Sequence, residues 1–124
     1  MIGVSAAVLI GMPGTAQAAS NYNGKCGAGY GEIDHLELPG ANIYLTYSAS
    51  TGKNCVVTVR DVPGAAKPMS AYVMRTGDPF SNDLDKGDFT AYAGPVFVYA
   101  PNTCIEWGGR YDQNSLQRTH DHCN

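Results

Sequence analysis

Apolar residues recur at every second position through most of this chain, and no other feature constrains its fold as strongly. From residue 30 onward, Gly or Pro interrupts the alternation about every ten residues. A period of two places alternate side chains on opposite faces of an extended strand, whereas a helix needs a spacing of three or four. The pattern predicts an all-β fold of about seven to eight short antiparallel strands, either a small β-sandwich or an open barrel.

The clearest pair of predicted strands covers residues 43–47 and 55–60, joined by a hairpin loop at 49–54 that contains Gly52. On the two facing sides of this hairpin we expect Ile43, Leu45 and Tyr47 against Cys55, Val57 and Val59. The other predicted strands lie at 30–38, 69–75, 89–93, 96–99, 104–107 and 117–123.

The stretch 76–88 is the most polar part of the chain and is rich in Gly, Pro and Asp, which predicts an exposed, mobile loop. The three carboxylates of its segment 83–88 are not spaced as in a calcium loop of the EF-hand kind. Such a loop needs a glutamate at its twelfth position, and the residue in that position, counted from Asp83, is Gly94. We interpret 83–88 as a solvated acidic loop.

Four cysteines, an even number, favour two disulfides in a small exported chain, and they are Cys26, Cys55, Cys104 and Cys123. Three pairings are open. We favour Cys26–Cys55 with Cys104–Cys123, because each bridge then joins neighbouring segments. A zinc site is the alternative, but the chain contains no C-x-x-C motif.

Residues 1–18 have the features of a cleavable export signal. An uncharged apolar run is followed by Pro13, Gly14 and an A-x-A site ending at Ala18. The basic n-region is missing because the first basic residue is Lys25, so we hypothesise that the true start codon lies upstream. The run is shorter than the ~20 residues that span a bilayer. We therefore expect a secreted protein without a membrane anchor, with residues 19–124 as a single domain.

The charge and motif content argue against several classes of function. The formal net charge is −3, and the eight basic residues are scattered singly, so no nucleic-acid partner is expected. The chain has no G-x-S-x-G elbow and no H-E-x-x-H zinc motif, and its cysteines are assigned to bridges. We predict that the protein is not an enzyme and needs no cofactor.

Two histidines near the end of the chain are weak candidates for metal ligands. His120 and His122 are two residues apart, and on a strand they would share a face. Terminal strands often carry exposed polar residues without a role, so we expect no metal here.

Eight tyrosines and one tryptophan raise the alternative of polysaccharide binding, because exposed aromatic rings can stack on sugar rings. The candidate stacking residues are Tyr44, Tyr72, Tyr92 and Trp107. Aromatic residues also fill the core of a small β domain, and we expect Trp107, which follows Cys104 closely, to pack beside a disulfide. A third alternative is a secreted protease inhibitor that uses 76–88 as its exposed loop, although no cysteine within this loop would tether it.

Four blocks of sequence resemble one known family. They are 22–30 (Tyr-Asn-Gly-Lys-Cys-Gly-Ala-Gly-Tyr), 43–60 with its Ile-Tyr-Leu-Thr-Tyr and Thr-Gly-Lys-Asn-Cys segments, 92–96 (Tyr-Ala-Gly-Pro-Val) and 104–109 (Cys-Ile-Glu-Trp-Gly-Gly). In this order they resemble the spore-associated protein A family of streptomycetes and related actinobacteria. Residues 76–88 and 110–122 depart from the family pattern.

The resemblance implies an exported protein found with the spore surface and attaches no catalytic activity or functional residue to the chain. We therefore expect a secreted, non-enzymatic structural protein of the envelope or spore surface, whose partners are surface components of the spore or cell wall, polysaccharide among them. A module that binds extracellular or cell-wall polysaccharide is the alternative, and a protease inhibitor is the third.

Overall fold

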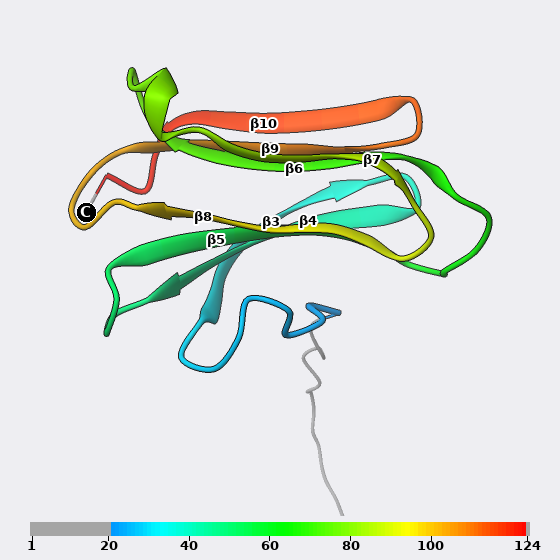
Figure 1. Ribbon diagram of the computed structural model, residues 1–124, viewed down its shortest axis with the longest axis horizontal. Helices are drawn as coiled ribbons and strands as arrows, with labels where there is room; N and C mark the ends of the chain where they lie inside the picture. Colours follow the sequence, from blue (N-terminus) through cyan, green and yellow to red (C-terminus); the bar gives the residue numbers. More distant parts are fainter. Residues whose placement is uncertain (1–20, 124) are drawn as a thin grey trace, which may run out of the picture.

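The computed structural model describes residues 21–123, and within this range the chain is a sandwich of two four-stranded antiparallel sheets (Figure 1). One sheet has the order β10-β9-β6-β7 and the other has the order β3-β4-β5-β8. The strands are β3 (Gly31–Leu38), β4 (Ala41–Ser48), β5 (Lys53–Arg60), β6 (Lys67–Arg75), β7 (Asp83–Phe89), β8 (Tyr92–Tyr99), β9 (Ile105–Tyr111) and β10 (Asn114–Asp121). The predicted all-β fold is confirmed, and of the two architectures left open the chain adopts the sandwich.

The core lies between the two sheets and follows the alternation of the sequence. Alternate residues of β6 and β9 point inward from one sheet, and Trp107 at the centre of β9 is completely buried. Its indole Nε1 donates a hydrogen bond of 3.0 Å to Oδ2 of Asp121. The other buried members of the core are Leu36, Leu38, Ile43, Leu45, Val56, Met69, Ala71, Val73, Ala93, Val96, Val98, Ala100 and Ile105.

Both predicted disulfides, Cys26–Cys55 and Cys104–Cys123, are present, and no described cysteine is free. The second bridge joins the start of β9 to the residue that follows β10 by two positions. It therefore fixes the end of the chain to the strand with which β10 pairs.

The faces predicted for the β4–β5 hairpin are wrong by one residue. In the observed register Leu45 lies opposite Val56, whereas Val57 lies opposite Tyr44. A shift of one residue moves every side chain of a strand to the other face. The alternation did not reveal the register because β5 is buried on both faces: Val56 and Val57 are each fully inaccessible to solvent.

The prediction of a mobile loop over 76–88 is also wrong for its second half. After a short 3-10 turn, η1 (Pro79–Ser81), the chain forms the edge strand β7. Oδ2 of Asp83 accepts a hydrogen bond of 2.9 Å from the backbone N–H of Phe97, and Oδ2 of Asp85 accepts one of 2.8 Å from that of Gly94. Two of the three carboxylates that suggested a solvated loop therefore connect the edge of one sheet to β8 of the other.

Residues 92–99 form one strand, where the sequence suggested two strands around Gly94 and Pro95. The pairing with β5 continues past these two residues through a shift of register between Val56 and Thr58. Gly94 has a φ of 95°, and a Cβ atom there would lie 2.8 Å from the carbonyl oxygen of Val56. Glycine at this position lets the strand pass close to β5.

The segment that precedes β3 lies across the outer face of the β3-β4-β5-β8 sheet, as the blue chain below the lower sheet in Figure 1 shows. The Cys26–Cys55 bridge holds it there, and the rings of Tyr22 and Tyr44 lie 5.9 Å apart. We call residues 21–30 the cover segment and this side of the molecule the covered face. Because of the cover segment, only 3% of Tyr44 is exposed.

The predicted export signal at 1–18 lies outside the described residues. Among residues 21–123, no helix is long and apolar enough to cross a membrane.

Candidate functional site

The outer face of the β10-β9-β6-β7 sheet is a candidate site, because no described strand lies over it and only the short turn η1 rises at one end (Figure 1). We call this side of the molecule the open face. The strand register arranges the outward residues at its centre in two adjacent rows. One row is Leu84, Tyr72, Gly108 and Gln117, and the next is Lys86, Ser70, Arg110 and Ser115. All of these residues except Gly108 line a shallow depression of about 300 Å³.

Tyr72 is held in one orientation across the middle of the open face. Its hydroxyl lies 2.9 Å from Oε2 of Glu106 and 3.2 Å from Oε1 of Gln117, and donates to one of them at a time. Gly108 stands between Tyr72 and Gln117 in the row, so the ring crosses a position that has no side chain. Burial raises the pKa of the Tyr72 hydroxyl, and the hydrogen bond to Glu106 and its negative charge raise it further. Tyr72 is therefore a neutral, fixed ring over the whole physiological pH range.

Lys86 and Arg110 supply positive charge beside this ring. Both lie directly opposite Ser70, so two strand spacings, about 10 Å, separate their backbones. Nε of Arg110 donates to the carbonyl oxygen of Asp112 at 2.6 Å, which orients the guanidinium. Neither cation forms an ion pair with a carboxylate of residues 21–123.

Two carboxylates border this pair of cations. Glu106 accepts a hydrogen bond from Tyr72, and Asp88 lies two residues beyond Lys86 on the edge strand β7. The positive charge of the open face is thus confined to the row that contains Ser70.

The structure separates the four aromatic residues that the sequence suggested for ligand stacking. Only Tyr72 lies on the open face. Trp107 is buried in the core, as predicted, and Tyr44 lies under the cover segment. Neither residue therefore presents its ring to a ligand. Tyr92 is half-buried, with Nζ of Lys25 lying 5.5 Å from the centre of its ring.

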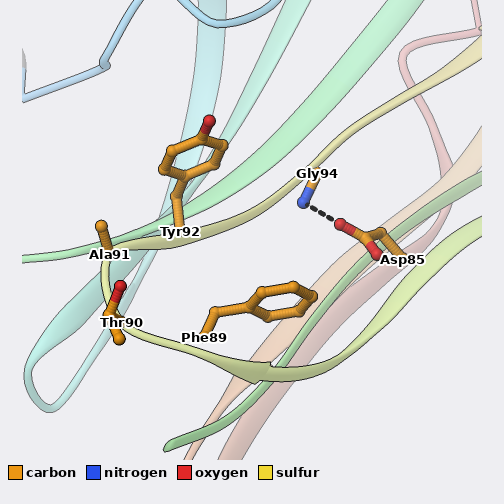
Figure 2. Close-up of a pocket in the computed structure, with 6 residues that line it drawn as sticks. All are labelled: Asp85, Phe89, Thr90, Ala91, Tyr92 and Gly94. Carbon is orange, nitrogen blue, oxygen red and sulfur yellow. Dashed lines mark hydrogen bonds between the residues drawn. The ribbon is translucent and has the colours of Figure 1, made fainter. Parts of the chain in front are cut away.

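A second depression, of about 310 Å³, lies at the turn between β7 and β8 (Figure 2). Its lining includes Phe89, Thr90, Ala91 and Tyr92. The carboxylate of Asp85, which also lines it, accepts a hydrogen bond from the backbone N–H of Gly94. Asp85, the one acidic residue in this lining, therefore connects β7 to β8 of the other sheet. None of these six lining residues is a histidine, cysteine or lysine that could act with it.

The two histidines near the chain end lie in different surroundings. His120 and His122 have φ values of 53° and 49°, so the backbone leaves the extended conformation and they are not arranged as a strand would place them. His120 lies beside Cys104 and Cys123, whose sulfur atoms are bonded to each other.

His122 joins a cluster of two carboxylates. Its Nε2 lies 2.9 Å from Oδ2 of Asp34 and 3.7 Å from Oδ2 of Asp121. One ligand atom from each of the three residues lies within 4.8 Å of the others, which is close enough to hold a metal ion. In the structure the cluster connects β3 to the end of the chain, and Asp121 is also the acceptor for Trp107.

Sequence reasoning found Tyr72 but missed Lys86, Arg110 and Gln117. Lys86 was hidden because the polar stretch around it was interpreted as a loop, and only the pairing of β6 with both β7 and β9 brings the two cations to one face. The charged residues at 83, 85, 86 and 88 are the signal that could have revealed an edge strand there, because edge strands often carry charges.

The comparisons with known proteins agree with the family that the sequence blocks indicate. The chain is 45% identical over 96 residues to spore-associated protein A of Streptomyces coelicolor, an alignment that covers 77% of this chain and 62% of that protein. The resemblance to the spore-associated protein A family is confirmed. The chain thus matches less than two thirds of the length of this curated relative. No protein-family model matches the chain, and no solved structure matches it.

Proposed function

We propose that this protein is an exported, non-enzymatic structural protein that associates with the surface of the spore or cell envelope. Its relative is named as spore-associated, and this chain shares 45% of its residues over the aligned region. Two disulfides in a domain of this size are typical of proteins that work outside the cytoplasm.

The observation that carries the proposal is the contrast between the two outer faces. One face is closed by the cover segment and a disulfide, whereas the other presents Tyr72, Lys86 and Arg110 to solvent without a partner segment. A stable sandwich with one open polar and aromatic face suits attachment to a surface. The open face favours polysaccharide as the surface component that is bound.

The state of the acidic side chains and histidines supports a role without catalysis. Asp83 and Asp85 accept hydrogen bonds from backbone N–H groups, and His122 is hydrogen-bonded to Asp34. These groups act in holding the fold together. None of them is paired with a hydroxyl nucleophile in the described part of the chain.

Immunolabelling of intact spores tests the proposal. The labelled protein is expected at the outer surface, with both disulfides formed and its amino terminus beyond residue 18. Recovery from the cytoplasm with reduced cysteines would contradict the proposal, as would turnover of a peptide or glycoside substrate by the purified protein.

A further inference from the structure

We infer that the open face binds an acidic polysaccharide, with a sugar ring against Tyr72 and carboxylates of the sugar chain at Lys86 and Arg110. The inference rests on the proposed surface role and adds to it a binding site and a class of ligand. The two rows of the β10-β9-β6-β7 sheet each carry one part of the argument.

The first row suits a sugar ring. The face of an aromatic ring is electronegative and attracts the C–H groups on the apolar face of a pyranose. The hydroxyl of Tyr72 is bound to Glu106 or Gln117, so the ring is already fixed before a ligand arrives. Leu84, 52% exposed, extends this apolar surface on the side opposite Gly108.

The second row suits negative charge along an extended ligand. Lys86 and Arg110 have no carboxylate partner in residues 21–123, and a charge-assisted hydrogen bond is about twice as strong as a neutral one. Ser70 separates the two cations, so they do not converge on a single small anion. Their spacing instead fits successive charges of one chain.

The two rows together select a sugar acid over other polyanions. A phosphate polymer without sugar rings would use the cations but gain nothing from Tyr72, and a neutral glycan would use Tyr72 but not the cations. The protein as a whole carries a net charge of −3, so general electrostatic attraction does not favour a polyanion. Binding of an acidic glycan therefore requires the local pair of cations.

Affinity electrophoresis of the oxidised, signal-free protein in gels that contain polygalacturonate, dextran or polyphosphate tests the inference. Polygalacturonate is expected to retard the protein more strongly than dextran or polyphosphate, each of which offers only one of the two kinds of contact. Retardation by dextran or by polyphosphate as strong as that by polygalacturonate would overturn the inference, and so would the absence of retardation by polygalacturonate.

Two double variants with the same change in net charge give the matched comparison. Lys86→Gln with Arg110→Gln removes the cations of the open face, and it should weaken binding about tenfold or more. Lys25→Gln with Lys53→Gln removes two exposed cations elsewhere and should leave binding unchanged. Equal weakening by both pairs would show that net charge alone matters and would overturn the inference.

The ring is tested by two single variants at one position. Tyr72→Ala should weaken binding about tenfold, and Tyr72→Phe, which keeps the ring, should weaken it no more than about threefold. Thermal unfolding of each variant establishes that it is folded. Unchanged binding by a folded Tyr72→Ala protein would overturn the inference.

The failure of the inference is distinguishable from the failure of the proposed function. If spores are labelled but polygalacturonate does not bind, the surface role stands and the ligand class is wrong. If polygalacturonate binds but spores are not labelled, the site stands and the surface role is wrong.

Discussion

The two outer faces of this sandwich are made of similar short strands, yet one is sealed and the other is open. On the covered face Tyr44 is 3% exposed and Val57 is completely buried, whereas on the open face 52% of Leu84 is accessible. The difference is due to the cover segment, which Cys26–Cys55 attaches to β5. It follows that β5 carries buried apolar residues on both sides, and that the polar residues of the other sheet are available to a ligand.

Removing the bridge that attaches the cover segment should have the largest effect. The double change Cys26→Ser and Cys55→Ala opens a loop with a sequence separation of 29 residues. We expect the free energy of unfolding to fall by about 3–4 kcal/mol on chain-entropy grounds. Urea unfolding of the oxidised wild type and the variant measures this, and a loss below about 1 kcal/mol would mean that the cover segment is held by its other contacts.

Tyrosines on the two faces should differ in what they contribute to stability. Tyr44→Ala removes a buried ring that packs against Tyr22, and we expect a loss of about 3 kcal/mol. Tyr72→Ala removes a half-exposed ring and its hydrogen bonds, and we expect about 1 kcal/mol. Equal losses in urea unfolding would remove the distinction between the faces.

The Tyr72 hydroxyl should make stability depend on alkaline pH. Its pKa is raised in the folded protein, whereas in the unfolded chain it is near the ordinary value of about 10. The unfolded chain therefore loses this proton first, so the contribution is complete below about pH 10 and declines as the pH rises above it.

Comparing unfolding free energies of the wild type and Tyr72→Phe between about pH 9 and pH 11 isolates this contribution. The wild type should lose stability more steeply than the variant, because Tyr22 and Tyr44, whose pKa values are also raised, are common to both proteins. Parallel curves would mean that burial and Glu106 do not raise the pKa of Tyr72 in the folded protein.

Exposed apolar side chains outside the covered face should contribute least to the free energy of unfolding. Phe80 at the tip of η1 is 100% exposed, and Leu84 is 52% exposed. Phe80→Ser and Leu84→Ser should each change the free energy of unfolding by less than about 0.5 kcal/mol in the same urea assay. A loss above about 2 kcal/mol for Leu84→Ser would mean that the open face is packed against something in solution.

Much of the fold could be predicted because the signals were local. The period of two gave the strands, and the positions of the four cysteines were enough to favour the observed pairing. Those signals fail where a strand is buried on both faces, as β5 is at Val56 and Val57. A continuous apolar run does not show how such a strand pairs with its neighbour. They fail again at Asp83 and Asp85, whose hydrogen-bond donors belong to a strand on the other sheet.

The candidate site was less predictable because it depends on strand order. Tyr72 could be chosen by residue type alone, but its partners Glu106 and Gln117 come from strands that follow it by more than thirty residues in the chain. The positions of His120 and His122 depend on their positive φ values, which the sequence did not indicate.

The central claim is that the protein attaches by its open face, and lysine footprinting tests it without any substitution. The free protein and the protein bound to spores of Streptomyces coelicolor would be acetylated briefly, and the modification of each lysine measured by mass spectrometry. The account predicts that Lys86 is protected on binding while Lys25 and Lys53 react as in the free protein. Protection of Lys25 and Lys53 with Lys86 still reactive would contradict it.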